Sequence, residues 1–307
     1  MQGLLCPVVT PFGADLSPDP ARFIAHCRWL LDQGCSGLAV FGTTSEANSL
    51  SVDERIALFD ALLAAGVPAA RLLPGTGCCA LTDSARLTRH VLQAGAAGVL
   101  VLPPFYYKNV SEEGLFRSYA AVIERVADPR LRLYLYHIPA MTQVPVPLPV
   151  IERLRAAFGP TVAGIKDSSG DAQYLGALLD RFAGTGFGIF PASESLLLSS
   201  LRRGAAGCIT ASANVNPGPI AGLIESWRAP GAEARQARLD GVRKALQALP
   251  LIPAVKATLA LYSGDEAWSR MRPPLVELDA AQRASLSASL SALGFAMPGL
   301  IHAIEAG

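Results

Sequence analysis

The chain has 307 residues, a length typical of one α/β barrel or of two modest domains. Hydrophobic residues make up 51% of it and charged residues 17%, so it can bury a large core and is not a disordered protein. The formal net charge of +1 argues against a nucleic acid or an anionic membrane surface as a partner, because both bind clustered lysines and arginines.

The first residues, "MQGLLCPVVTPF", lack the basic segment and the long apolar run of a signal peptide. No apolar run approaches the roughly 18 residues that a membrane span needs. The six cysteines are scattered without C-x-x-C or Cys/His ligand spacing, and we expect reduced thiols, with Cys78 and Cys79 as small buried residues. The sequence therefore predicts a cytoplasmic protein without a metal site.

Eight short apolar runs alternate with longer stretches of helical period. The runs span residues 4–9, 37–42, 71–77, 98–104, 132–139, 162–167, 187–192 and 207–213. Several of the intervening stretches open on a residue suited to cap a helix, namely Ser51, Thr82 and Ser111. Strands of this kind, separated by helices, predict a parallel sheet covered on its faces, and eight units predict a TIM (β/α)8 barrel. The alternative is a doubly wound open sheet, but the G-x-G-x-x-G turn that usually follows its first strand is absent.

The last part of the chain, from about residue 228, is rich in Ala, Leu and Arg and has a helical period. We expect helices over residues 230–249 and 278–294. The predicted organisation is a catalytic barrel over residues 1–227 and a helical extension over residues 228–307 that packs on it.

Chemistry is expected where the barrel strands end. The second run ends in "GTTSE", residues 42–46, where small and hydroxyl residues fit either a carboxylate or phosphate cradle or an ordinary capped turn. Tyr106 and Tyr107 follow the fourth run, and a pair of loop tyrosines favours interface or lid packing.

The fifth and sixth runs place side chains on alternate faces. Tyr134 and Tyr136 share one face of the fifth run, and His137 takes the other, where a hydrogen-bonded structural role is favoured. In the sixth run Gly164 and Lys166 share a face, so that Gly164 leaves room below the lysine. Asp167 then points outward, and we expect it to cap a helix or form an ion pair.

Lys166 stands at the end of a buried strand, in a chain where only four of the 26 Lys and Arg residues are lysines. A structural lysine in this position needs a buried carboxylate partner, and the nearby acids point outward or lie in loops. A functional lysine uses the same burial, because desolvation lowers the pKa of the amine and makes it a nucleophile. The functional interpretation is favoured, and Lys256, in a helical stretch outside the barrel, is the rival.

Four motifs in order, "GTTSE", "PPFYYK", "YHIPA" and "GIKDSSGD", resemble the dihydrodipicolinate synthase/N-acetylneuraminate lyase family of Schiff-base aldolases, and the resemblance runs over essentially the whole chain. It implies an imine between a 2-oxo acid and Lys166, with Tyr136 moving protons. It also implies that Thr43 and Thr44 hold the carboxylate, that Thr44 links a hydroxyl relay, and that the Ile209 carbonyl lies near the lysine. By the same resemblance Tyr107 enters a neighbouring subunit's site, so a dimer or tetramer is expected, with no cofactor beyond the covalent imine.

Three positions depart from the family pattern. Met141 stands where lysine-pathway enzymes carry an Arg for the aldehyde's carboxylate, Ser45 replaces a glycine, and Ala192, followed by Ser193 and Glu194, replaces another. These changes favour a sugar-acid-derived aldehyde over aspartate semialdehyde. Ser45 and Met141 are themselves expected to be substrate-binding positions. The candidate hydroxyl-binding residues are Thr142, Gln143, Ser168, Ser193, Glu194, Thr210 and Ser212. The alternatives are dihydrodipicolinate synthase itself, an aryl-pyruvate or related variant, and a 2-oxo-acid-binding regulator that has lost turnover.

Overall fold

The computed structural model describes residues 1–301 and contains seven short parallel strands. They form two groups of hydrogen-bonded neighbours, β2-β1-β7 and β3-β4-β5-β6. Their bounds are β1 (Gly3–Cys6), β2 (Gly37–Leu38), β3 (Val99–Val101), β4 (Leu133–His137), β5 (Val162–Asp167), β6 (Gly188–Pro191) and β7 (Gly207–Ile209).

The third apolar run, residues 71–77, joins the two groups without forming a regular strand. It bridges β2 at Leu72 and β3 at Gly75, both in parallel orientation. Pro74 has no N–H for a ladder, and a Cβ at Gly75 would lie 2.1 Å from the carbonyl oxygen of Phe41, so the sequence here permits close approach but not regular pairing. On the other side the Ala206 amide donates to Ile189 at 2.9 Å and links β7 to β6. The predicted TIM barrel is confirmed, with seven strands and one bridging segment.

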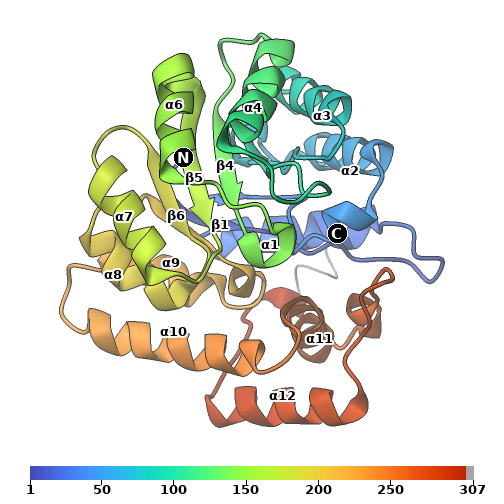
Figure 1. Cartoon of the computed structure of the whole chain (residues 1–307). Coiled ribbons are helices and arrows are strands. Elements are labelled where there is room, and N and C mark those ends of the chain that lie inside the picture. Colours follow the sequence, from blue (N-terminus) through green and yellow to red (C-terminus); the bar gives the residue numbers. More distant parts are fainter. Residues whose placement is uncertain (302–307) are drawn as a thin grey trace.

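In the described part of the chain, nine helices, α1 to α9, accompany the strands. They surround the barrel (Figure 1). Ser51 and Ser111 cap α2 and α4 as predicted, whereas α3 begins before Thr82, with Ala80 at its cap. The bounds are α1 (Pro20–Asp32), α2 (Val52–Ala64), α3 (Leu81–Gln93), α4 (Glu112–Val126), α5 (Pro139–Thr142), α6 (Leu148–Phe158), α7 (Ala172–Phe182), α8 (Leu197–Arg202) and α9 (Pro217–Ser226).

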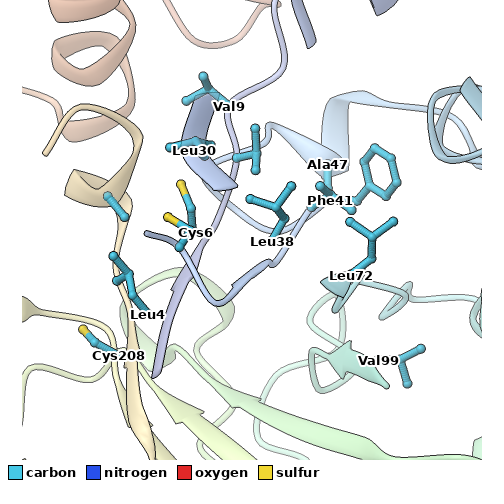
Figure 2. Close-up of a cluster of buried hydrophobic side chains, with 14 of the residues drawn as sticks. Leu4, Cys6, Val9, Leu30, Leu38, Phe41, Ala47, Leu72, Val99 and Cys208 are labelled. Atoms are coloured by element: carbon cyan, nitrogen blue, oxygen red, sulfur yellow. The ribbon is translucent and has the colours of Figure 1, made fainter. Parts of the chain in front are cut away.

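Alternation along the strands divides the buried side chains into two layers. Leu5 of β1 faces the barrel interior with Tyr134, Phe190 and Ile209. Its neighbour Leu4 belongs to the larger layer between strands and helices, part of which Figure 2 shows. The interior is therefore packed below its open end, and the residues at the strand ends form the floor of any site there.

Three further helices, α10 (Ala232–Gln247), α11 (Leu251–Ser263) and α12 (Ala280–Ala292), pack together against one side of the barrel (Figure 1). Leu239, Leu246 and Leu259 belong to the same buried cluster as the barrel helices. The helices predicted at 230–249 and 278–294 are thus present, while residues 302–307 of the predicted extension lie outside the described residues. No single helix among the described residues is long and apolar enough for a membrane span; α10 and α11 reach that length and composition only together, across a bend of 105°.

The cysteines are free thiols in the structure. Cys6, Cys27, Cys35 and Cys208 are buried, but Cys79 is exposed and Cys78 half-buried. The expectation that the adjacent pair is buried was wrong for Cys79, because the segment lies in the loop before α3 rather than in a strand.

Candidate active site

Neighbouring strands bring Lys166 and Tyr136 together. The parallel register of β4 and β5 pairs the two residues directly. Lys166 Nζ donates a hydrogen bond to the Tyr136 hydroxyl at 3.1 Å and lies 4.3 Å from the centroid of its ring. The two residues are only 3% and 2% exposed, so the amine and the phenol meet in a largely water-free place at the carboxyl end of the strands.

The two buried lysines differ in their partners. Lys256 Nζ lies 2.6 Å from the carboxylate of Glu46, and both side chains are fully buried. Among the described residues no carboxylate lies within 4.0 Å of Lys166 Nζ, whose hydrogen-bond partner is the phenol. Lys256 therefore has the partner that a structural lysine needs, and Lys166 lacks it.

The "GTTSE" turn lies against Tyr136. The tyrosine hydroxyl donates to Thr43 Oγ1 at 3.2 Å. Burial acts to raise the pKa of the Tyr136 phenol, but the charge of Lys166 and the hydrogen bonds with Thr43 and Lys166 outweigh it, so the pKa lies below its ordinary value of 10.0. A phenol in this setting exchanges protons more readily than a free tyrosine.

Two backbone amides of the same turn are available as hydrogen-bond donors. The amides of Ser45 and Glu46 bond to Gly42 and Thr43 and close the turn. Within residues 1–301 the amides of Thr43 and Thr44 have no acceptor, and both residues line the cavity described below. This geometry fits the predicted cradle for a carboxylate.

Ser45 is not placed to bind a substrate. It is fully buried, its hydroxyl donates to the Val8 carbonyl, and it accepts from the Gly42 amide at 3.2 Å. The hydroxyl that replaces the family's glycine thus ties the turn to the segment after β1, and Ser45 does not line the cavity.

A cavity of about 790 Å³ opens above Lys166. Its floor contains Lys166, Tyr136 and Ile209, and its walls include Met141 and Ser193, as expected for substrate-binding positions. Met141 is 65% exposed at the rim. Part of the wall comes from the C-terminal segments 250–253 and 274–278, which the sequence analysis did not assign to the site.

Tyr107 lies outside this cavity. Its side chain is 73% exposed and packs edge-to-face on Tyr106, with 5.3 Å between ring centroids. Lys108 Nζ donates to the Thr142 carbonyl at 3.0 Å and holds the loop near the cavity rim. In a single chain, then, Tyr107 does not join the other predicted catalytic residues.

Glu194 is also placed differently from the prediction. It is 0% exposed, accepts a hydrogen bond from Thr210 at 2.6 Å and pairs with Arg243 of α10 at 3.3 Å. Arg243 Nη1 also donates to Thr210 and Ser212. Glu194, Thr210 and Ser212 therefore hold an arginine and are not free for a substrate, and Arg243 is the residue of this cluster that faces the cavity.

Sequence reasoning missed Arg243, although a signal was present. Leu239, Val242 and Leu246 form the buried stripe of α10, and Arg243 falls within the same stripe. An arginine on the apolar face of an amphipathic helix needs a buried partner, so this pattern predicts a polar contact in the interior.

His137 and Asp167 have local structural roles. His137 Nδ1 accepts from the Val146 amide at 3.0 Å, and its ring stacks on Tyr174, which confirms the predicted hydrogen-bonded role. Asp167 accepts from the Ser169 amide at 3.0 Å, so it stabilises its own turn rather than capping a helix; Asp171 caps α7 instead.

Comparison with known proteins decides the family. A model of the dihydrodipicolinate synthetase family matches residues 1–293. An uncharacterized DapA-like lyase of Chloroflexus aurantiacus is 35% identical over 291 residues, which cover 94% of this chain and 95% of that protein. This chain belongs to the dihydrodipicolinate synthetase family.

Solved structures of the family have the same architecture. Dihydrodipicolinate synthase from Agrobacterium tumefaciens matches with a TM-score of 0.88 at 32% identity, covering 95% of this chain and 99% of that one. YagE, a prophage protein of the family from E. coli K12 solved in complex with pyruvate, matches with a TM-score of 0.87 at 27% identity, covering 96% and 99%. The chain is accordingly a lyase of the dihydrodipicolinate synthetase family on a TIM barrel.

Proposed function

We propose that this lyase is a Schiff-base (class I) aldolase that condenses pyruvate or a related 2-oxo acid with an aldehyde, or cleaves the corresponding product. The observation that carries the proposal is the buried Lys166 amine, which is hydrogen-bonded to a phenol and has no carboxylate partner among the described residues. That arrangement suits a nucleophile better than a structural charge.

The reaction proceeds without a metal or further cofactor. Lys166 Nζ attacks the C2 keto carbon of the 2-oxo acid, water leaves, and an imine forms. Loss of a proton from C3 gives the enamine, whose C3 attacks the aldehyde carbon, and the alkoxide that results takes a proton. Tyr136, bonded to Lys166 and Thr43, is placed to deliver and receive these protons, and hydrolysis of the imine frees the amine.

The Thr43–Thr44 turn binds the 2-oxo acid's carboxylate in this proposal. Its two amides, which have no acceptor within residues 1–301, suit an anion, and its hydroxyls add donors beside Tyr136. A carboxylate held there fixes C2 near the amine, so that the attack of the amine becomes an effectively unimolecular step.

The aldehyde is proposed to be derived from a sugar acid. The dihydrodipicolinate synthase alternative needs a partner for the carboxylate of aspartate semialdehyde, and Met141 offers none. The other alternative, a regulator without turnover, is less well supported because the Lys166–Tyr136–Thr43 chain of hydrogen bonds is intact.

Tyr107 keeps a role in this proposal through assembly. Its exposed ring beside the cavity rim fits a residue that completes the site of a neighbouring subunit, as the family resemblance implies. The proposed active form is therefore a dimer or tetramer.

Borohydride trapping tests the reaction class. Incubation with pyruvate and borohydride, followed by intact mass measurement, should give one reduced pyruvate adduct on the wild type and on Lys244→Ala, which lacks an exposed lysine of α10. The Lys166→Ala variant should give none. An unmodified wild type, or an adduct that persists in Lys166→Ala, would overturn the proposal.

A further inference from the structure

Besides Lys166, the described residues that line the cavity include one cation, Arg243, and its charge is already balanced by Glu194. Arg243 Nη1 meets Glu194, Thr210 and Ser212 at 3.3, 3.1 and 3.2 Å. When the Gln247 amide turns its oxygen toward the guanidinium, it accepts from Nη2 at 2.9 Å and from Nε at 3.1 Å. Of the five guanidinium hydrogens, one on Nη2 is left for a ligand.

Helix α10 is fixed in this position at a second point. Gln236 donates to the Glu194 carbonyl at 2.8 Å and accepts from the Leu198 amide at 3.0 Å. These hydrogen bonds join the loop after β6 and helix α10 into one wall. Ser193, in that loop, and Gln247, one turn beyond Arg243, both line the cavity beside the arginine.

The opposite wall is apolar. It is formed by the segments 250–253 and 274–278, which contribute Leu251, Ile252 and Val276 among others. Glu277, which is exposed, is the one charged residue that these two segments place along the cavity. The lining from the C-terminal part of the chain thus combines the paired Arg243 and the neutral Gln247 with a largely apolar surface.

We propose that the C-terminal extension builds the aldehyde subsite, and that this subsite takes an uncharged, hydroxyl-bearing tail rather than a tail ending in a carboxylate or phosphate. The inference rests on the function proposed above. Hydroxyls can bond to the free Nη2 hydrogen, to Gln247 and to Ser193, while the carbon side of the tail packs on the apolar wall.

A negatively charged tail is disfavoured by the charges around this subsite. Glu194 takes Nη1 of Arg243 and Gln247 takes Nε and one hydrogen of Nη2, so no edge of the guanidinium is left for two parallel bonds to a carboxylate. Glu277, a further negative charge, also lines the cavity. Met141 adds no donor. A carboxylate that enters this subsite gives up its hydration and finds no unpaired cation in return. A hydroxyl pays a smaller free-energy cost for leaving water.

Two matched substrates test the inference. Both are 2-oxo-3-deoxy acids of equal chain length, one ending in a hydroxymethyl group and the other in a carboxylate, and pyruvate release is followed with lactate dehydrogenase. We expect kcat/KM for the hydroxymethyl substrate to be higher by about tenfold or more. Equal or better cleavage of the dicarboxylate, or rapid turnover of aspartate semialdehyde with pyruvate, would overturn the inference.

A variant at the rim tests the residues themselves. Gln247→Leu removes a neutral hydrogen-bonding side chain and frees the Nε and Nη2 hydrogens of Arg243 for a carboxylate. We therefore expect the ratio of KM for the hydroxymethyl substrate to KM for the carboxylate substrate to rise about three- to tenfold, with kcat nearly unchanged. Arg238→Ala, which removes an exposed arginine of α10 outside the cavity, should leave KM unchanged. An unchanged ratio of the two KM values in Gln247→Leu contradicts the inference.

Trapping with pyruvate separates this inference from the proposed function. A wild-type protein that forms the Lys166 adduct but cleaves neither substrate leaves the imine chemistry standing and overturns the subsite. Absence of the adduct overturns the proposed function and the inference with it.

Discussion

Lys166 and Lys256 show how a residue's partners, rather than its burial alone, decide its role. Burial lowers the pKa of Lys256, while the carboxylate of Glu46 acts in the opposite direction and holds the side chain in a fixed ion pair. Lys166 faces a phenol whose own pKa is lowered by that contact. The sequence placed Lys166 at a strand end, but the partner of Lys256 lies 210 residues away along the chain, a separation that no local pattern reveals.

One of the two buried histidines among the described residues, His26, gives a prediction for stability against pH. His26 is fully buried against Trp29 and Trp268, Nε2 donates to Asn214 at 3.2 Å, and burial lowers its pKa to about 4 from 6.5. On acidification the unfolded chain therefore binds a proton at His26 before the folded chain does. The contribution of neutral His26 to the unfolding free energy is present above about pH 6.5 and is lost as the pH falls toward 4.

The variant His26→Gln keeps an N–H for Asn214 but cannot titrate in this range. Between pH 7 and pH 5 we expect the wild type to lose about 2 kcal/mol more unfolding free energy than the variant. Urea unfolding at intervals of pH measures the difference, and pH 8, where the histidine is neutral in both states, supplies the baseline. Parallel pH profiles for the two proteins would contradict the prediction.

Within the barrel, the contact between β4 and β5 depends on Gly164. The sequence predicted that this glycine leaves room below Lys166, and the structure fills that room with the ring of Tyr134. Periodicity was enough to find the strands and to put Tyr136 and Lys166 on inward faces. It could not find Arg243 or the apolar C-terminal wall, because their place in the site depends on how distant helices dock.

Substitution at Gly164 tests this packing. A Cβ there would lie 2.4 Å from the Gly188 carbonyl oxygen and 2.7 Å from Tyr134 Cδ1, and backbone on one side cannot yield. Gly164→Ala should destabilise the protein by about 1–3 kcal/mol or more. Gly222→Ala is the matched control, since a Cβ there meets nothing within 4 Å and alanine favours the helix α9. If the unfolding midpoint of both variants lies at the same urea concentration as that of the wild type, the strands around Gly164 are less tightly packed than described.

Across the whole molecule, the C-terminal helices are joined to the catalytic turn. Glu46, two residues after Thr44 of the cradle, accepts from Lys256 of α11 at 2.6 Å and from the Arg272 amide at 3.1 Å. Arg272 also binds Glu54 of α2. The extension thus forms one wall of the cavity and fixes the turn on its floor, so barrel and extension act as one unit at the site.

Breaking this connection should cost more than breaking any surface pair. Lys256→Met leaves the Glu46 carboxylate buried without its counter-charge, and we expect a loss of about 3–5 kcal/mol in unfolding free energy. Arg86→Met, which removes an exposed pair with Asp53, should cost about 1 kcal/mol or less. In the double variant Lys256→Met/Glu46→Gln no charge is left unpaired, so part of the loss should return. Urea unfolding of Lys256→Met, of Glu46→Gln and of the double variant gives the coupling energy between Lys256 and Glu46 directly. Strictly additive losses would mean that Lys256 stabilises the fold by packing alone, and the cradle would then owe its position to the barrel rather than to the extension.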